Sequence, residues 1–209
     1  MKDAIEKRLA SSLKSNNQQP NIDLAIDLAQ LEQKQAILEL VQLAGSGPKE
    51  QSRDAIKVLY ELGKINPEQL LPHVDTLIGI LPASDSRMIW GILQALNSIC
   101  DLVPQKLMAN LNIILEASDR SSVIAFDNMM AILAKINAFE EFSATVTPVL
   151  LMRLNHAAPN QFPTYVELAS ATIPEKNKDQ LLKIIDQRLS AIASEAKRKR
   201  LLKIKKILQ

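Results

Sequence analysis

Apolar residues recur along the chain at spacings of three and four positions, which places them on one face of a helix. Ile89, Leu93, Leu96 and Cys100 follow this spacing. Short polar stretches such as Ser84-Asp85-Ser86 separate one apolar stripe from the next. Asn66 followed by Pro67 adds a helix-capping side chain and a proline that the first turn of a helix tolerates. The pattern therefore predicts antiparallel helices joined by turns of a few residues.

The helical pattern repeats with a period near 37 residues. Each apolar position that we compared between 56 and 78 meets an apolar position 37 residues later, and Pro67 falls on Pro104. Another step reaches Met130 and Leu133, although Glu141 stands where the proline is expected. The register decays after that step, and an insertion or deletion near 159–163 would explain the decay. A fixed period of this length is typical of helical repeat arrays.

The pattern predicts twelve helices in six antiparallel pairs. A helix pair of this size cannot bury its own apolar face, so each pair must stack on the next. We therefore expect one domain over residues 1–209, with atypical capping pairs at 1–30 and 173–209 and core repeats at 31–172. The expected helices are 2–14 with 20–30, 31–44 with 49–64, 67–81 with 86–100, 104–117 with 121–137, 142–156 with 161–172, and 177–193 with 195–208.

Two adjoining segments carry a resemblance to a known family. Residues 70–81 are expected to form the first helix of a repeat, and this helix contains Pro72. Thr147-Pro148 belongs to another first helix that carries a proline. Residues 82–96 continue with an Asp85-containing turn, a basic residue at position 87, and a second helix rich in Ala and Leu. This arrangement resembles HEAT repeats, and the resemblance implies an all-α fold, a right-handed α-α superhelix. HEAT-like proteins bind many unrelated partners, so the resemblance does not select one.

Composition agrees with a helical chain. Hydrophobic residues make up 47% of the sequence, aromatic residues only 3%, and five glycines are too few for the turns of a many-stranded protein. The single cysteine cannot form an internal disulfide, which fits a reducing compartment. No apolar run approaches the roughly 20 residues that span a bilayer, and no signal-peptide pattern follows Met1. We therefore expect a soluble cytoplasmic protein.

The resemblance also implies where a partner would bind. In HEAT-like stacks the second helices line a concave groove, so their positions outside the apolar stripe are candidates for contact. Trp, Tyr and Arg are the residue types that most often carry binding energy in interfaces. We expect a protein or peptide partner there, with the chain acting as a non-enzymatic scaffold or regulatory subunit. An alternative is that the aromatic rings only fill gaps between helices. The candidate contacts are Arg53, Lys57, Tyr60, Trp90, Gln94, Asn97 and Asp127.

A second candidate surface lies in the last helix. Residues 194–209 hold seven Lys or Arg and one acid, while the other 193 residues hold 18 basic and 22 acidic side chains. A basic amphipathic helix can bind nucleic-acid phosphates or anionic membrane surfaces. The alternative is a capping helix whose charges are solvated. The residues that would contact an anionic partner are Lys197, Arg198, Arg200, Lys203 and Lys206.

The sequence offers little chemistry for catalysis. His73 and His156 are the two histidines, far apart in the predicted stack, and no metal-ligand spacing is present. Cys100 lies on an apolar stripe, as a core residue would. We therefore expect no catalytic residue, metal or cofactor. Some HEAT-like solenoids are similar to DNA glycosylases that act on alkylated bases, and Trp90 with Asp127 could serve such a reaction. The acidic body of the chain disfavours this alternative.

Overall fold

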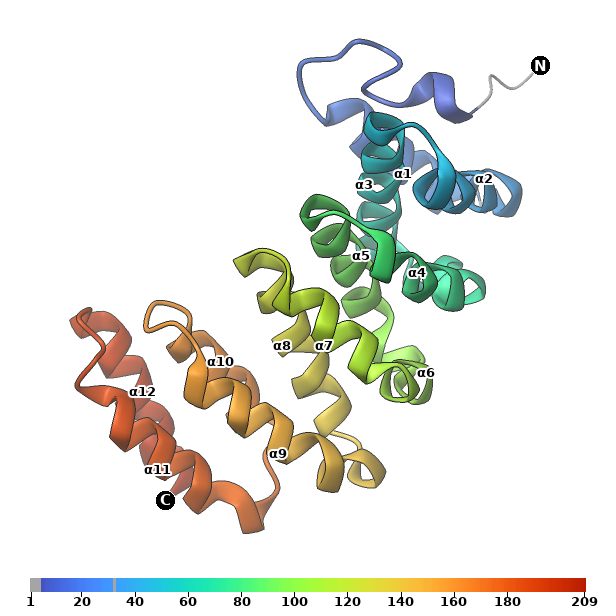
Figure 1. Cartoon of the computed structure of the whole chain (residues 1–209). Coiled ribbons are helices and arrows are strands. Elements are labelled where there is room, and N and C mark those ends of the chain that lie inside the picture. The colour runs from blue at the N-terminus through green and yellow to red at the C-terminus, as the bar shows by residue number, and fades with distance from the viewer. Residues whose placement is uncertain (1–4, 32) are drawn as a thin grey trace. The chain divides into compact units, whose positions relative to one another are not determined.

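The computed structural model describes residues 5–31 and 33–209 (Figure 1). These residues form twelve α-helices and five 3-10 helices, and no strand occurs among them. The chain divides into two compact units, Met1–Met129 and Met130–Gln209. The boundary falls inside helix α8 (Val123–Asn137). We describe each unit by itself, and the expectation of a single domain stays a prediction.

The helices of the first unit lie in two rows (Figure 1). One row holds α1, α3 and α5, because α3 packs against α1 on one side and α5 on the other. The second row holds α2, which packs on α3, and α4, which packs on α2 and α5. The helices thus bury their apolar faces against neighbours in the same row, and α3 and α5 also pack against the second row. The bounds are α1 Gln19–Leu31, α2 Lys34–Ser46, α3 Lys49–Ile65, α4 Val74–Ile80, α5 Ser86–Ile99, α6 Pro104–Ala109 and α7 Leu111–Asp119.

Two helices that the sequence predicts as continuous are broken. The segment 67–81 consists of the 3-10 helix η2 (Pro67–His73), α4, and the start of η3 (Leu81–Ala83). The segment 104–117 consists of α6 and α7. His73 (φ −110°, ψ 3°) and Asn110 (φ −112°, ψ 18°) leave helical geometry at these breaks, 37 positions apart. Pro72 precedes the first break but alanine precedes the second, so the break belongs to the repeat rather than to the proline.

The N-terminal helix predicted over 2–14 is not formed. Residues 2–4 lie outside the described residues, as does position 32 of the helix predicted over 31–44. The described part holds the 3-10 helix η1 (Ile5–Arg8) and a single turn that ends at Lys14, whose φ of 53° is left-handed. The amide of Ser15 donates to the carbonyl of Ala10 at 2.9 Å, as in a Schellman cap. This cap stops the helix after one turn.

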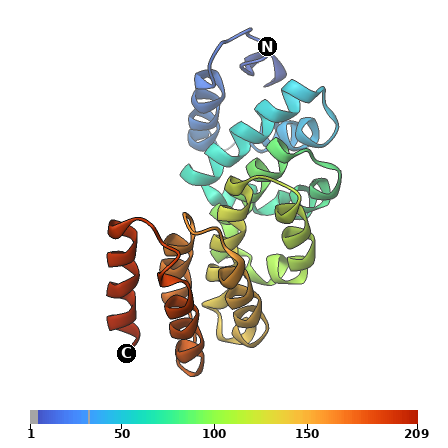
Figure 2. The ribbon, with the colours of Figure 1, turned by 60° about the vertical axis from the view of Figure 1, so that its left-hand side comes forward.

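The second unit repeats the arrangement in two rows. Helix α10 (Phe162–Ser170) packs against α12 (Glu195–Leu208), and α9 (Glu140–His156) packs against α11 (Lys178–Leu189). A further 3-10 helix, η5 (Glu175–Asn177), precedes α11. Helices α10 and α11 are shorter than the predicted 161–172 and 177–193. Figure 2 shows α12 alongside its neighbours at the end of the chain.

Helices α3 and α5 approach each other closely within the first unit. A Cβ atom added at Gly63 would lie 2.3 Å from Ser98 Oγ, and one added at Gly91 would lie 3.1 Å from Ile56 Cγ2. Glycine at both positions lets the two helix backbones come near each other. The core around this contact consists mainly of fully buried Leu and Ile side chains.

Candidate partner-binding surface

Helices α3 and α5 bring two aromatic side chains of the predicted groove together. The rings of Tyr60 and Trp90 have centroids 5.4 Å apart and planes tilted by 50°, an arrangement that aromatic pairs favour. Trp90 remains half-buried, so part of its ring reaches solvent. The α3–α5 surface, which we define as the exposed face around Trp90, therefore presents an accessible aromatic ring.

Two hollows meet at Trp90. The first has a volume of about 210 Å³ and is lined by Gln18 of the N-terminal segment together with residues of α3 and α5. The second has a volume of about 470 Å³ and extends to Ser122 and Ile124 at the start of α8. Arg53, Arg87 and Trp90 line both hollows. Trp90 therefore contributes to the lining of two neighbouring hollows on this surface.

Tyr60 is a correction to the predicted contact set. Its exposed fraction is 5%, so the ring is buried rather than open to a partner. The ammonium groups of Lys57 and Lys64 lie 4.6 and 5.0 Å from the ring centroid, and Trp90 covers another side. Burial raises the pKa of the Tyr60 hydroxyl. Tyr60 thus packs against Trp90 and forms part of the lining of the first hollow.

Lys57 and Lys64 share one carboxylate. Lys57 Nζ lies 2.6 Å and Lys64 Nζ 3.0 Å from Glu61 Oε1. Burial alone would raise the pKa of Glu61, but the hydrogen bonds from the two lysines outweigh burial and lower it. Both lysine charges are therefore largely satisfied within α3, by Glu61 and by the face of the Tyr60 ring.

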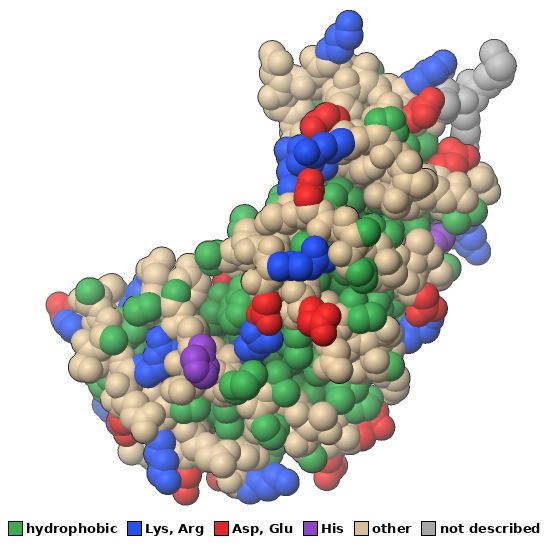
Figure 3. Space-filling model, in the orientation of Figure 1, with side chains coloured by type: hydrophobic (Ala, Val, Ile, Leu, Met, Phe, Trp, Pro, Cys, Tyr) green, Lys and Arg blue, Asp and Glu red, His purple; other side chains and the backbone are tan. Residues whose placement is uncertain are grey.

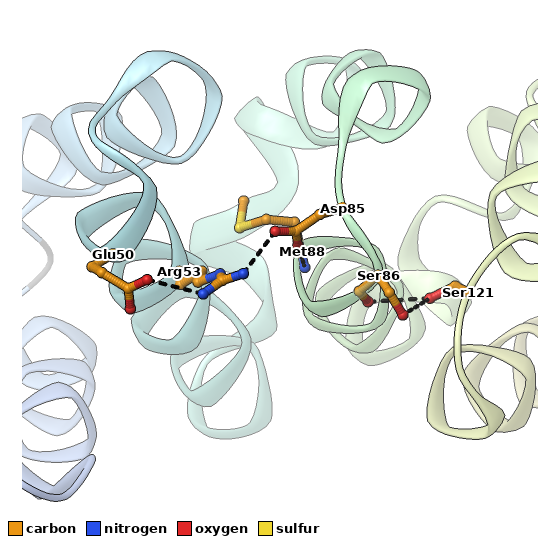
Figure 4. A network of polar contacts seen from close by, with 6 residues as sticks. All are labelled: Glu50, Arg53, Asp85, Ser86, Met88 and Ser121. Atoms are coloured by element: carbon orange, nitrogen blue, oxygen red, sulfur yellow. Dashed lines mark hydrogen bonds and ion pairs between the residues drawn. The ribbon is translucent and has the colours of Figure 1, made fainter.

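Arg53 joins α3 to the beginning of α5 (Figure 4). Its guanidinium group donates to Glu50 Oε1 and Asp85 Oδ2, both at 2.9 Å. Asp85 also caps α5, accepting the amide of Met88 at 3.0 Å. The Met88 amide and then the Arg53 guanidinium hold the pKa of Asp85 below its ordinary value. Arg53 is thus fixed in place on the wall of both hollows.

The predicted ladder of Arg53, Trp90 and Asp127 is only partly assembled. Arg53 and Trp90 line the same hollows, whereas Asp127 is exposed on α8 and lines neither. Gln94 and Asn97 are half-buried on α5. Asn97 donates to the side chain of Asn128 at 3.2 Å, which links α5 to α8. The two amides extend the surface from Trp90 along α5.

Arg87 and Ile124 belong to this surface but were absent from the predicted set. Arg87 is exposed at the start of α5, and 51% of Ile124 is exposed on the first turn of α8. Arg87 follows the capping Asp85 by two positions, and that spacing was the available signal for it. The predicted set was drawn from a single helical stripe, which runs through Trp90 and passes by both residues.

The basic helix α12 is largely engaged in packing. Its apolar stripe buries Leu201, Ile204 and Leu208. Arg200 donates to both carboxylate oxygens of Glu167, at 2.7 and 2.5 Å. Of the other predicted contacts, Lys197 bonds to Asn160, Arg198 donates to the carbonyl of Ile192 at 3.0 Å, and Lys203 and Lys206 are exposed without an ion pair among the described residues.

The described residues contain no cluster of three His, Cys or carboxylate side chains that could hold a metal ion. Cys100 is fully buried, as predicted for a core residue. His73 is half-buried, which lowers its pKa, and His156 is exposed. Within 5–31 and 33–209, no helix is both long and apolar enough to cross a membrane.

Comparison with known proteins supports the fold alone. No family model matches the chain, and neither does any curated protein. Among solved structures, a designed armadillo repeat protein in complex with the peptide (KR)4 aligns with a TM-score of 0.67 at 19% identity, over 98% of each chain. A computationally designed armadillo repeat protein for modular peptide recognition aligns with a TM-score of 0.66 at 20% identity, again over 98% of each chain.

These neighbours confirm the predicted all-α repeat superhelix. They are armadillo-type rather than HEAT proteins, so the HEAT assignment is not confirmed. The broken first helices fit a repeat of three helices, such as α6, α7 and α8, better than the predicted pair of two. The chain is therefore a helical repeat protein with an armadillo-like fold.

Proposed function

We propose that this chain is a non-enzymatic scaffold that binds a peptide segment of a partner protein on the α3–α5 surface. The observation that carries the proposal is the position of Trp90, half-buried between two hollows and packed against Tyr60. A tryptophan in such a place can bury a large area on binding at a low cost in side-chain entropy.

The similarity to designed peptide-binding proteins supports this proposal at the level of the fold. The structure neighbours are described as binding (KR)4 or as built for peptide recognition. The amide of Gln94 lies on the same surface and could pair with the main chain of an extended peptide. Main-chain pairing supplies affinity, and side-chain hollows supply specificity.

The packing of α12 favours a capping role for this helix over nucleic-acid binding. Its apolar stripe and Arg200 pack on the preceding helices, which is what a terminal repeat requires. The exposed Lys203 and Lys206 provide a smaller charge than the sequence suggests. The phosphate contacts of nucleic-acid binders are usually more numerous. We therefore place the partner on the α3–α5 surface.

The experiment is a selection of octapeptides on the full chain from a random display library. Selected peptides should bind the parent protein and lose at least tenfold in affinity for Trp90→Ala, because the removed ring is the central contact. Met152→Ala is the control, since Met152 on α9 is 51% exposed and lines neither hollow. Equal binding to all three proteins would show that the α3–α5 surface is not the site.

A further inference from the structure

The charges that line the two hollows are mostly positive. Arg53, Lys57 and Arg87 are the basic residues that line one or both hollows, and Asp85 is the only acid among the lining residues. Lys57 and Arg53 are already paired with neighbouring carboxylates. Arg87 has no ion pair among the described residues, so its guanidinium group is available to a partner.

The single acid of the hollows is occupied. Asp85 accepts hydrogen bonds from Arg53 and from the amide of Met88. A basic side chain entering the second hollow would find Asp85 already paired with Arg53, and it would be repelled by Arg53 and Arg87. An acidic side chain would meet Arg87 without disturbing anything, and it would also lie near Arg53. Charge complementarity therefore favours an acidic partner.

The second hollow also has an apolar side. Ile124, which is half-exposed, and Trp90 line it together with Arg87. Side chains at positions i and i+2 of an extended peptide point to the same side. A peptide with an acidic residue two positions from an apolar one could therefore place the acid on Arg87 and the apolar side chain between Trp90 and Ile124.

We propose that the partner is an extended acidic peptide in which an Asp or Glu is followed two positions later by an aliphatic residue. Arg87 pairs with the acid, and Trp90 with Ile124 holds the aliphatic side chain. This inference rests on the proposed function and adds the chemistry of the partner. Figure 3 shows Lys and Arg side chains beside Asp and Glu on the visible face of the first unit. The proposed preference for an acidic peptide therefore depends on the charges that line the two hollows, and not on an excess of basic side chains over the whole face.

The test uses the intrinsic fluorescence of Trp90, which is the only tryptophan of the chain and lies inside the proposed site. Three octapeptides are titrated into the full-length protein: Asp-Ser-Leu-Ser repeated twice, and the same peptide with Lys or Ser in place of Asp. We expect the acidic peptide to bind most tightly, by about five- to tenfold over the serine peptide at low salt. The lysine peptide should bind least.

The variant Arg87→Glu should reverse the order of the acidic and basic peptides. Lys183→Glu changes the net charge equally on an exposed position of α11, and it should leave the order unchanged. Tighter binding of the lysine peptide, or an acidic preference that survives Arg87→Glu, would overturn the inference while leaving the peptide-binding proposal in place. A failure of all three peptides would also overturn it, and the display selection would then judge the scaffold proposal separately.

Discussion

Arg53 Nη2 lies 2.9 Å from Asp85 Oδ2, and this ion pair connects α3 with the cap of α5, the equivalent helix one repeat later. The same carboxylate caps α5 by accepting the Met88 amide. Ser122 stands 37 positions after Asp85 and accepts the amide of Ala125 at 3.4 Å, so the capping role recurs at the start of α8. Asp85 in the turn before α5 thus sets both the start of α5 and the position of Arg53 on the α3–α5 surface.

Asp85→Ala and Asp85→Asn separate these two roles. Asparagine caps a helix about as well as aspartate, so Asp85→Asn should lose only the exposed ion pair, a few tenths of a kcal/mol. Asp85→Ala loses the cap as well and should cost about 1 kcal/mol more in the free energy of unfolding. Urea unfolding at neutral pH measures both. Equal losses in the two variants would contradict the capping role.

Gly63→Ala should destabilise the contact between α3 and α5. Its new Cβ would lie 2.3 Å from Ser98 Oγ and 2.8 Å from Leu70 Cδ1. Leu70 is fully buried, and Ser98 Oγ is held by the carbonyl of Ala95 at 2.6 Å, so neither can move freely. We expect a loss of about 1–3 kcal/mol from overpacking, partly offset by the better helix propensity of alanine.

The matched control is Gly79→Ala in α4. Apart from the chain neighbours and the backbone of its own helix, no described heavy atom lies within 4 Å of the Cβ that this change would add, and the position is exposed. Alanine in a helix interior is then favoured over glycine by up to about 1 kcal/mol. The midpoint temperature of thermal unfolding should therefore fall for Gly63→Ala and rise for Gly79→Ala. A stabilising effect at both positions would show that α3 and α5 are less closely packed than the structure has them.

The order of helices followed from the sequence because burial in two rows imposes a helical spacing on apolar residues, and the 37-residue period exposes the repeat. The breaks at His73 and Asn110 could not be predicted from the sequence. The apolar stripe passes through both breaks without interruption, from Leu70 to Val74 in the first case. Packing of the neighbouring helices, rather than local propensity, decides where such a helix turns.

The sequence predicts which helical positions lie near the candidate surface, but it does not predict how exposed each side chain is. Tyr60 and Trp90 follow from the same helical stripe, yet Tyr60 is buried and Trp90 is only half-buried. That difference depends on Lys57 and Lys64, which cover the tyrosine ring from its own helix. Arg87 lies off the stripe, and its place in the hollows depends on how the cap at Asp85 starts α5.

A buried polar network ties the N-terminal segment to the first unit. Asn21 accepts the amide of Ala10 at 2.9 Å and donates to Asp54 Oδ1 at 2.8 Å. Asp54 Oδ2 accepts the amide of Ser11 at 2.7 Å. Both side chains are buried, with exposed fractions of 0% for Asn21 and 4% for Asp54. The network replaces the hydrogen bonds that a longer N-terminal helix would have made.

Asn21→Ala should therefore loosen the segment before α1. It leaves the Ala10 amide and one oxygen of Asp54 without these partners, and a buried unsatisfied group costs about 1–3 kcal/mol. Amide hydrogen exchange at Ala10 and Ser11 should become faster, whereas exchange in α12 should not change. Asn16→Ala is an exposed control and should leave both regions as they are. Unchanged protection of Ala10 and Ser11 in Asn21→Ala would rule out the anchoring role.

Acid should weaken the second unit through the pair of Glu167 and Arg200. The hydrogen bonds from Arg200 lower the pKa of Glu167. A lowered folded pKa means that the stabilisation is complete above the ordinary glutamate pKa of about 4.3, and that it is lost as pH falls through the folded value. Both side chains are about 40% exposed, so solvent screening limits the contribution to about 0.5 kcal/mol.

Glu167→Gln removes the titrating group and should lose less stability than the parent between pH 7 and pH 3. Unfolding in urea at both pH values gives the difference, which should be about 0.5 kcal/mol at low salt. Glu175→Gln provides the comparison, because Glu175 is 85% exposed and pairs only with Lys178 within its own turn. If Glu167→Gln and Glu175→Gln respond to acid alike, the Arg200 pair does not stabilise the packing of α12 on α10. In that case the capping interpretation of α12 would rest on its buried apolar stripe of Leu201, Ile204 and Leu208 alone.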